Sequence, residues 1–537
     1  MKRKSLFYFI LFGVTALVTG AFFNEKVISL NDLSVAKIPD SKYGAFLAAQ
    51  HAIYVNDFDT AHKLIDSIND VDCETVNHTR DLVSFLDGKL PENADKLANN
   101  KDSASQIIYD AYLVQNGKWD TLYNRHKAKK SVVYAPFRIW AAVSKNRKTE
   151  TLKYIDSLDS NDSWKSFVRG QIYAEYKKTE LAAQEFAKVK IDFMNINDYV
   201  YIMSFYNAHN MHDAAEKLRQ DFSSSPGGMF MADFDEIPDW KIFSGPKNAI
   251  AFNLIQNVSH TQIMLYSDLS VLMLRFSQTI GPDAQYFRDA INYYIGQFFT
   301  NTHGNYRSVF NQISPTSLFY LFAKMRMAEE DNSATDLKDI LQKQPLFIPA
   351  LNKLVAIYTR AGDQSAALRV INNALKNERL YDNGRSYLIK RRAMVYLVFG
   401  DTKSAQADIH SAAKTFGKDP EILAVQARIW TAQNREIENA YDYAMTLIKK
   451  DPTDVFAWDT LAMVVALREG NAAALHILEK IGSAAKTCSS LFEHLGDAYV
   501  QAGNIESAKK AYLRALEIPD DGLSIASKIQ KKLRKLK

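Results

Sequence analysis

Two features of this chain could bind a metal ion or a phosphate: a histidine pair, and a lysine that follows glycine and proline. His209 and His212 stand three residues apart, and two imidazoles at that spacing share one side of a helix, as zinc ligands can. Without a cysteine or carboxylate at ligand spacing, the pair does not predict a metal site. Gly245-Pro246-Lys247 lacks the spaced glycines and the hydroxyl of a phosphate-binding loop, so it predicts a turn.

Sequence motifs of the common enzyme classes are missing from the chain. It contains no GxSxG, no HExxH, no GxxxxGK[ST] and no paired CxxC. We therefore predict no catalytic residues, no cofactor and no metal. The residues that remain informative are those that position helices.

Small residues recur at a fixed interval in the C-terminal part of the chain. Ala440, Ala474 and Ala508 are spaced 34 residues apart, and Ala405 precedes Ala440 by 35. A period of 34, with a small residue where two helices cross and a large one beside it, is typical of stacked helix–turn–helix repeats. Glycine (21) and proline (13) are scarce among the 537 residues, which also favours long helical stacks over a β protein.

The clearest copy of the repeat, FEHLGDAYVQAGNIESAKKAYLRALEIP, runs from Phe492 to Pro519 and resembles the tetratricopeptide repeat (TPR). Small and aromatic positions of that copy recur with the same spacing in the N-terminal half of the chain: Gly496, Tyr499, Ala508 and Tyr512 match Gly170, Tyr173, Ala182 and Phe186. The resemblance implies an all-α fold, an α-solenoid superhelix of TPR-like hairpins whose first helices form a concave wall. Such a wall binds other proteins.

The register of the TPR resemblance implies which residues line this groove. The partner-binding candidates lie on the first helices of the last two copies: Phe456, Asp459, Met463, Glu493, Asp497 and Gln501. The groove lacks the Lys/Asn/Arg set with which some TPR domains hold a terminal carboxylate. It is apolar with a few acidic residues, which suits a hydrophobic helix or extended segment that carries some basic residues. The same residues could instead pack against neighbouring helices.

The N-terminus predicts export. Lys2, Arg3 and Lys4 precede an apolar run from Leu6 to Phe23, the order of a signal sequence. The run is borderline between a signal peptide cut after Gly20 and an uncleaved membrane anchor. We expect a periplasmic protein, either soluble after cleavage or tethered to the inner membrane by residues 6–23.

The last residues predict a short basic helix. Ile525, Ile529, Leu533 and Leu536 fall on one face, and lysines and Arg534 occupy the rest. We interpret it as a cap over the last hairpin. Contact of its basic face with anionic lipid or an acidic partner is the alternative.

The predicted organisation follows from where the repeat is legible. Its parts are 1–23 signal peptide or signal anchor, 24–222 degenerate TPR-like repeats, 223–248 linker with three prolines, 249–344 degenerate helical hairpins, 345–519 clear repeats, and 520–537 basic capping helix. The chain has only two cysteines, Cys73 and Cys488, which we interpret as two unpaired core residues, with a long-range disulfide between them as the alternative.

The whole layout is similar to a family of exported bacterial TPR proteins of undefined function. This resemblance implies an envelope-located scaffold or adaptor that binds other envelope proteins or peptides through its concave face, without catalysis. The net charge of +5 is small for this length and does not indicate a nucleic-acid partner. The alternative hypothesis is a helical accessory or substrate-binding component of a cell-wall or envelope enzyme system.

Overall fold

The computed structural model describes residues 41–55, 57–225, 228, 237–260, 268–302, 305–416, 420–482, 488–518 and 522–536. Within these ranges the regular elements are helices and none is a strand, so the all-α prediction is confirmed. The apolar run of residues 6–23 lies outside them, and its role as signal or anchor stays a prediction. A search of the described helices finds none with the length and hydropathy needed to cross a bilayer.

The chain divides after Asp87 into two compact units. In the first unit, α2 (Lys42–Tyr54), α3 (Phe58–Asp66) and α4 (Glu74–Leu86) follow one another. Ala49 and Ala61 are completely buried where α2 and α3 cross. Cys73 is exposed at the start of α4, which corrects the expectation of a core position, and neither cysteine forms a disulfide.

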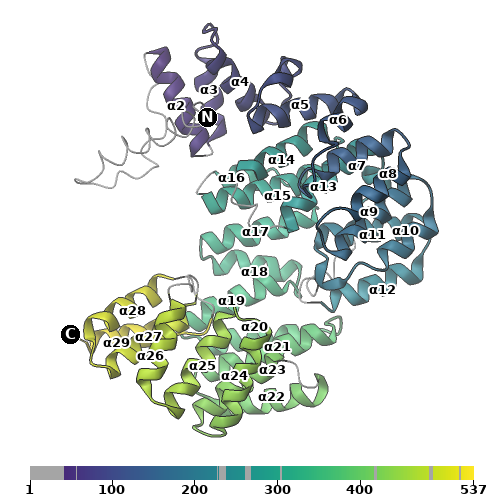
Figure 1. Cartoon of the computed structure of the whole chain (residues 1–537). Helices are drawn as coiled ribbons and strands as arrows, with labels where there is room; N and C mark the ends of the chain where they lie inside the picture. The colour runs from purple at the N-terminus through teal and green to yellow at the C-terminus, as the bar shows by residue number, and fades with distance from the viewer. Residues whose placement is uncertain are drawn as a thin grey trace. The chain divides into compact units, whose positions relative to one another are not determined.

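The second unit begins with a series of hairpins that we call the N-terminal array. After the 3-10 turn η2 (Ala94–Asn99), its helices are α5 (Ser103–Gln115), α6 (Trp119–His126), α7 (Ala135–Ser144), α8 (Lys148–Asp156), α9 (Asp162–Glu175), α10 (Thr179–Phe186), α11 (Ile196–Ala208) and α12 (His212–Ser223), with η3 (Ile191–Phe193) between α10 and α11. Successive helices pair as hairpins (Figure 1).

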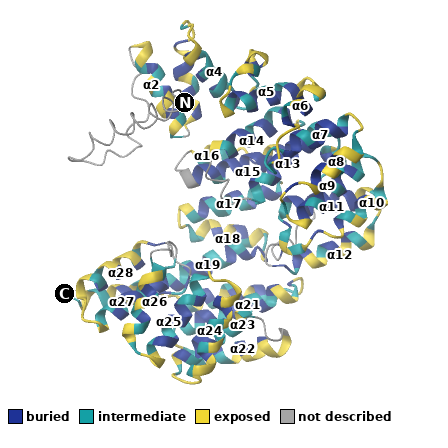
Figure 2. Ribbon diagram, in the orientation of Figure 1, coloured by how far each residue is buried: buried dark blue, intermediate teal, exposed yellow. Residues whose placement is uncertain are grey.

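A second layer of helices covers the first helices of this array. It consists of α13 (Pro246–His260), α14 (Asp268–Ile280), α15 (Gln285–Thr302) and α16 (Tyr306–Phe310). Helix α13 packs on α7, where Trp140 Nε1 donates a hydrogen bond of 2.8 Å to Asn253 Oδ1. Helix α14 packs on α5. It also contacts α7, where the ring centroids of Phe137 (α7) and Phe276 (α14) lie 5.1 Å apart. The inner face of the N-terminal array is therefore part of a buried core, as the dark ribbons in Figure 2 show.

The predicted linker between the halves is partly packed in the structure. Helix α12 ends at Ser223 and α13 begins at Pro246, with the turn η4 (Trp240–Phe243) between them. Phe243 is buried, and the Trp240 ring lies 4.9 Å from that of Tyr201. These contacts join the end of the segment to α11.

The C-terminal array contains the clear repeats. Its helices are α17 (Leu318–Glu330), α18 (Ala334–Lys343), α19 (Ile348–Ala361), α20 (Gln364–Leu375), α21 (Asp382–Val398), α22 (Thr402–Phe416), α23 (Pro420–Ala432), α24 (Ile437–Lys450), α25 (Val455–Arg468), α26 (Asn471–Gly482), α27 (Ser489–Gln501) and α28 (Ile505–Glu517), followed by α29 (Ala526–Arg534). The first helices α21, α23 and α25 pack side by side. This is the predicted solenoid of TPR-like hairpins.

Glycine–aromatic pairs set the crossing of the hairpins. A Cβ atom on Gly496 would overlap the ring of Tyr512, so only glycine lets α27 and α28 approach this closely. The same relation holds between Gly170 and Phe186 in α9 and α10, as the matched spacing predicted. It recurs between Gly296 of α15 and Phe310 of α16, where the repeat pattern is too worn to read.

Candidate functional site

The candidate site is the inner face of the C-terminal array, formed by its first helices. Helix α25 contributes three of the predicted groove residues and α27 the other three. Phe456 and Met463 are half-buried, and Gln501 is exposed. The remaining three, Asp459, Glu493 and Asp497, are each bound by another part of the chain.

Asp459 lies at the centre of a buried charged cluster that joins three successive repeats. Its Oδ2 accepts a hydrogen bond of 2.8 Å from Arg428 Nη2 on α23, and its Oδ1 lies 2.7 Å from His494 Nδ1 on α27. The guanidinium of Arg428 also stacks over the ring of Phe456, 3.8 Å from the ring centre. Because the Asp459 side chain is completely buried, it holds the repeats together and is not presented to a partner, although the register placed it in the groove.

The charges of this cluster stabilise one another. Burial alone would raise the pKa of Asp459, but the positive charges of His494 and Arg428 outweigh it and lower that pKa to about 2. Burial alone would lower the pKa of His494, but attraction by Asp459 outweighs it and raises the pKa above the usual value. Both effects favour an ionised Asp459–His494 pair at neutral pH.

Glu493 and Asp497 hold the basic C-terminal helix. Lys532 Nζ on α29 donates hydrogen bonds of 2.7 Å to Glu493 Oε1 and 2.6 Å to Asp497 Oδ2. Asp497 Oδ1 also accepts a 2.6 Å hydrogen bond from the hydroxyl of Tyr512. The acidic positions of the predicted groove are therefore occupied by a lysine of the same chain.

Residues 522–536, which we call the C-terminal segment, lie on this face. Leu523 packs against the apolar cluster of α21 and α23. Gly522 approaches α19 so closely that an added Cβ atom would lie 2.9 Å from Ala356 Cα. Lys528 Nζ donates a 2.9 Å hydrogen bond to the carbonyl of Val398 at the end of α21. Ile529 is buried on α28, which is the covering position expected for a capping helix.

Arg360 of α19 fixes both this segment and the end of α28. Its Nη1 donates to the hydroxyls of Ser524, at 2.7 Å, and Ser489, at 2.8 Å. Its Nη2 donates to the carbonyls of Ala515 and Leu516, at 2.7 and 3.2 Å. One guanidinium thus connects the first clear repeat to the last.

The sequence pattern does not indicate Arg360 or Arg428, because a repeat register describes positions within one repeat and not contacts between repeats. Each of these arginines acts on residues of other repeats, at separations of 28 to 164 residues. One signal was present: the acidic pair Glu493 and Asp497, four residues apart on one helix face, complements the basic helix that follows it.

One histidine of the pair, His209, has a structural role. His209 Nδ1 lies 2.9 Å from the carbonyl oxygen of Phe205, and its ring packs on the Phe205 ring. The described ranges contain no group of three His, Cys, Asp or Glu side chains arranged to hold a metal ion.

Among known proteins, only solved structures show similarity to this chain. No family model matches the chain, and no curated protein matches it. A tetratricopeptide repeat protein from Parabacteroides merdae is 15% identical over 47% of this chain and 92% of its own, with a TM-score of 0.31. A chain of the APC/C hetero-tetramer Cut9-Hcn1 is 13% identical over 94% of this chain and 98% of its own, with a TM-score of 0.34. Yeast Tom70 is 12% identical over 83% of this chain and 96% of its own, with a TM-score of 0.35. The assignment of TPR-like hairpins follows from the glycine–aromatic crossings and buried alanines of this chain itself.

Proposed function

We propose that the protein is an exported scaffold that binds segments of other envelope proteins on the inner face of its C-terminal array. The observation that carries the proposal is that this face already binds a polypeptide, the C-terminal segment. Apolar, main-chain and charged contacts all contribute to that binding. The face therefore has the chemistry that recognition of a polypeptide requires.

The contacts of the C-terminal segment define the kind of partner. A small residue is needed beside α19, apolar side chains follow at the positions of Leu523 and Ile529, and a basic side chain meets Glu493 and Asp497. A basic amphipathic segment of a partner would satisfy these positions in the same way. It would have to compete with a tethered segment whose effective concentration is on the order of millimolar.

The N-terminal sequence supports export. The basic residues followed by the apolar run from Leu6 to Phe23 direct the rest of the chain across the inner membrane. Sequencing the N-terminus of the protein from fractionated cells tests this step. A chain that starts near Ala21 indicates a cleaved signal, an intact chain in the membrane fraction indicates an anchor, and an intact chain in the cytoplasm contradicts export.

A photo-crosslinking amino acid at Gln501 tests the binding face in cells. Gln501 is exposed on α27, and Leu513, exposed on the second helix α28, is the matched control position. We expect the probe at Gln501 to capture one or a few envelope proteins that the probe at Leu513 does not capture. Excess synthetic peptide with the sequence of residues 522–536 should then reduce capture of the identified partner by the purified full-length protein.

The alternative function predicts a different result. If both probes yield only crosslinks within the chain, and the purified protein binds cell-wall material with no protein partner present, the protein acts on the polymer and the scaffold proposal is wrong.

A further inference from the structure

A second surface, on the outer side of the N-terminal array, carries a large excess of positive charge. From Lys118 to Lys153, over α6 to α8, the sequence contains ten lysines and arginines and only two carboxylates, Asp120 and Glu150. The resulting charge of this stretch exceeds the net charge of +5 of the whole chain. Positive charge is therefore concentrated on this part of the molecule.

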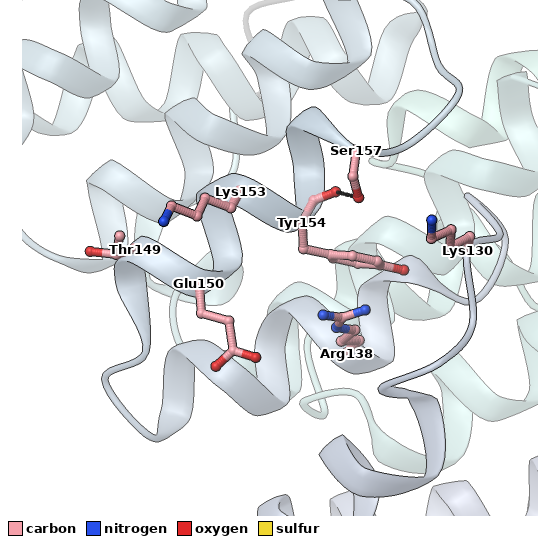
Figure 3. A pocket seen from close by; sticks show the side chains of 7 residues that line it. All are labelled: Lys130, Arg138, Thr149, Glu150, Lys153, Tyr154 and Ser157. Carbon is pink, nitrogen blue, oxygen red and sulfur yellow. Dashed lines mark hydrogen bonds between the residues drawn. The ribbon is translucent and has the colours of Figure 1, made fainter.

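An open pocket of about 550 Å³ lies within this surface. It is lined by Lys130, Arg138, Thr149, Glu150, Lys153, Tyr154 and Ser157 (Figure 3). Two of these side chains are fixed in place: the guanidinium of Arg138 lies 3.8 Å from the centre of the Tyr154 ring, and Arg138 Nη1 donates a 2.5 Å hydrogen bond to the carbonyl of Lys127. The hydroxyl of Tyr154 donates a 3.0 Å hydrogen bond to the carbonyl of Lys129. The pocket is thus formed by a rigid arginine–tyrosine pair with lysines around it.

The carboxylates near the pocket already have partners, whereas several lysines do not. Glu150 accepts a hydrogen bond from the hydroxyl of Tyr123, and Asp120 pairs with Lys145 at 2.7 Å. Lys130 and Lys153 form no ion pair with any described residue, and both are exposed. Glu150 keeps its negative charge, because its partner is a neutral hydroxyl, but the three cations Lys130, Arg138 and Lys153 outnumber it, so the lining of the pocket has a net positive charge.

The arrangement of these cations favours a row of negative charges over a single anion. Figure 3 shows Lys130 and Lys153 on opposite sides of the Tyr154 side chain, with Arg138 beside its ring. A phosphate or sulfate needs donors that converge on one point, whereas carboxylates spaced along a polypeptide can meet cations spaced along a surface.

Two other polyanions fit this surface less well. Binding to a lipid surface uses exposed apolar side chains, and none of the large exposed apolar side chains lies between residues 118 and 157. Single-stranded nucleic acid stacks its bases on exposed aromatic rings, but the one aromatic residue that lines the pocket, Tyr154, is buried and its ring is covered by Arg138.

We propose that this outer surface binds an acidic segment of a partner polypeptide, whose carboxylates pair with Lys130, Arg138 and Lys153. The surface is separate from the inner face of the C-terminal array, since α7 uses its opposite side to pack on α13. The proposal is therefore independent of the scaffold function proposed above, and each can fail without the other.

Fluorescence anisotropy of the full-length protein with a short fluorescein-labelled peptide, in which glutamate alternates with serine, tests the proposal. We expect saturable binding that weakens as salt is added, and roughly 10-fold weaker binding by the double variant Lys130→Glu/Lys153→Glu. The matched control is Lys414→Glu/Lys450→Glu, which changes the net charge equally at exposed lysines of α22 and α24. It should bind the peptide as the unmodified protein does.

Three results would overturn the proposal. The first is no binding of the acidic peptide, or equal weakening by the two double variants. The second is sedimentation of the protein with phosphatidylglycerol vesicles that is lost in Lys130→Glu/Lys153→Glu while the peptide does not bind, which would assign the surface to lipid. The third is displacement of the peptide by inorganic phosphate at constant ionic strength, which would indicate a site for a single small anion.

Discussion

The two arrays of the second unit both have their inner faces covered by the same chain, but the covering parts differ in chemistry. On the N-terminal array, α13 to α15 supply whole helices, with aromatic contacts such as Phe167 on Phe252 and a buried hydrogen bond from Trp140 to Asn253. On the C-terminal array, the covering part is the short C-terminal segment, which has no aromatic side chain and is held by the buried Ile529 and by the bonds of Arg360 and Lys532.

This difference separates a permanent core from a surface that can open. Burial of large aromatic side chains stabilises the folded state by several kcal/mol each, so the first inner face opens only when the fold is lost. An ion pair with partly exposed groups contributes about 1 kcal/mol or less, and the Lys532 side chain is 35% exposed. Ile525 and Ile529 of the segment are also buried, but they bury less apolar surface than the aromatic layer on the other array. We therefore expect the second inner face to release its covering segment while the repeats stay folded.

Replacing Trp140 with alanine should have the largest effect. We expect Trp140→Ala to lower the free energy of unfolding by about 3–5 kcal/mol, because it leaves a cavity between α7 and α13. Chemical denaturation followed by circular dichroism measures this loss. Trp140→Phe keeps most of the buried ring and should lose less. A loss as small as that of Leu181→Ala, at an exposed position, would contradict a permanent core at this face.

Removing Arg428 should destabilise the C-terminal array almost as much. Arg428→Met leaves the buried Asp459 with one partner, and an incompletely paired buried charge costs about 3–5 kcal/mol. The double variant Arg428→Met/Asp459→Leu removes both charges and should recover most of the loss. If the double variant is less stable than Arg428→Met, the cluster does not act through the pairing of its charges.

The sequence predicted the contacts that lie within a single repeat. Gly170 with Phe186 and Gly496 with Tyr512 meet as their spacing indicated, because each pair lies within one hairpin. Contacts between distant segments leave no periodic signal, so the pairing of Trp140 with Asn253, 113 residues later, could not be predicted.

The candidate site was predicted only in outline for the same reason. Asp459 occupies a groove position by register, yet Arg428 and His494 of the adjacent repeats enclose it. The sequence indicates the basic face of the last helix but not the residues that bind it, since the repeat register predicts that Glu493 and Asp497 face a partner.

Removing Arg360 should loosen the C-terminal segment without unfolding the array. Hydrogen bonds to a charged group contribute about 1.5–3 kcal/mol, so we expect Arg360→Met to speed hydrogen exchange of residues 522–536 by roughly 10- to 100-fold. Arg369, exposed on α20, provides the control Arg369→Met, which should leave this exchange unchanged. Unchanged exchange in Arg360→Met would mean that other contacts hold the segment.

The His494–Asp459 pair should make stability depend on pH, with the smallest of these effects. Because the pKa of His494 is raised above its usual 6.5, its contribution is full below pH 6.5 and is lost as the pH rises through the raised value. The contribution of Asp459, whose pKa is lowered from 3.8 to about 2, is present above pH 3.8 and is lost as the pH falls through about 2.

Melting temperatures at a series of pH values measure the histidine contribution. We expect the wild type to lose stability above pH 6.5 and His494→Gln to lose that slope. His410→Gln, at an exposed position of α22, should keep it. A slope that persists in His494→Gln would assign the pH dependence to another group.

Hydrogen–deuterium exchange of the intact wild-type protein tests the central claim most directly, with α13 and residues 522–536 followed in the same sample at low and high salt. We predict that α13 stays protected far longer and is insensitive to salt, while residues 522–536 exchange earlier and faster as salt screens the pairs of Lys532. Equal protection of the two segments, unchanged by salt, would contradict the claim that the inner face of the C-terminal array can open.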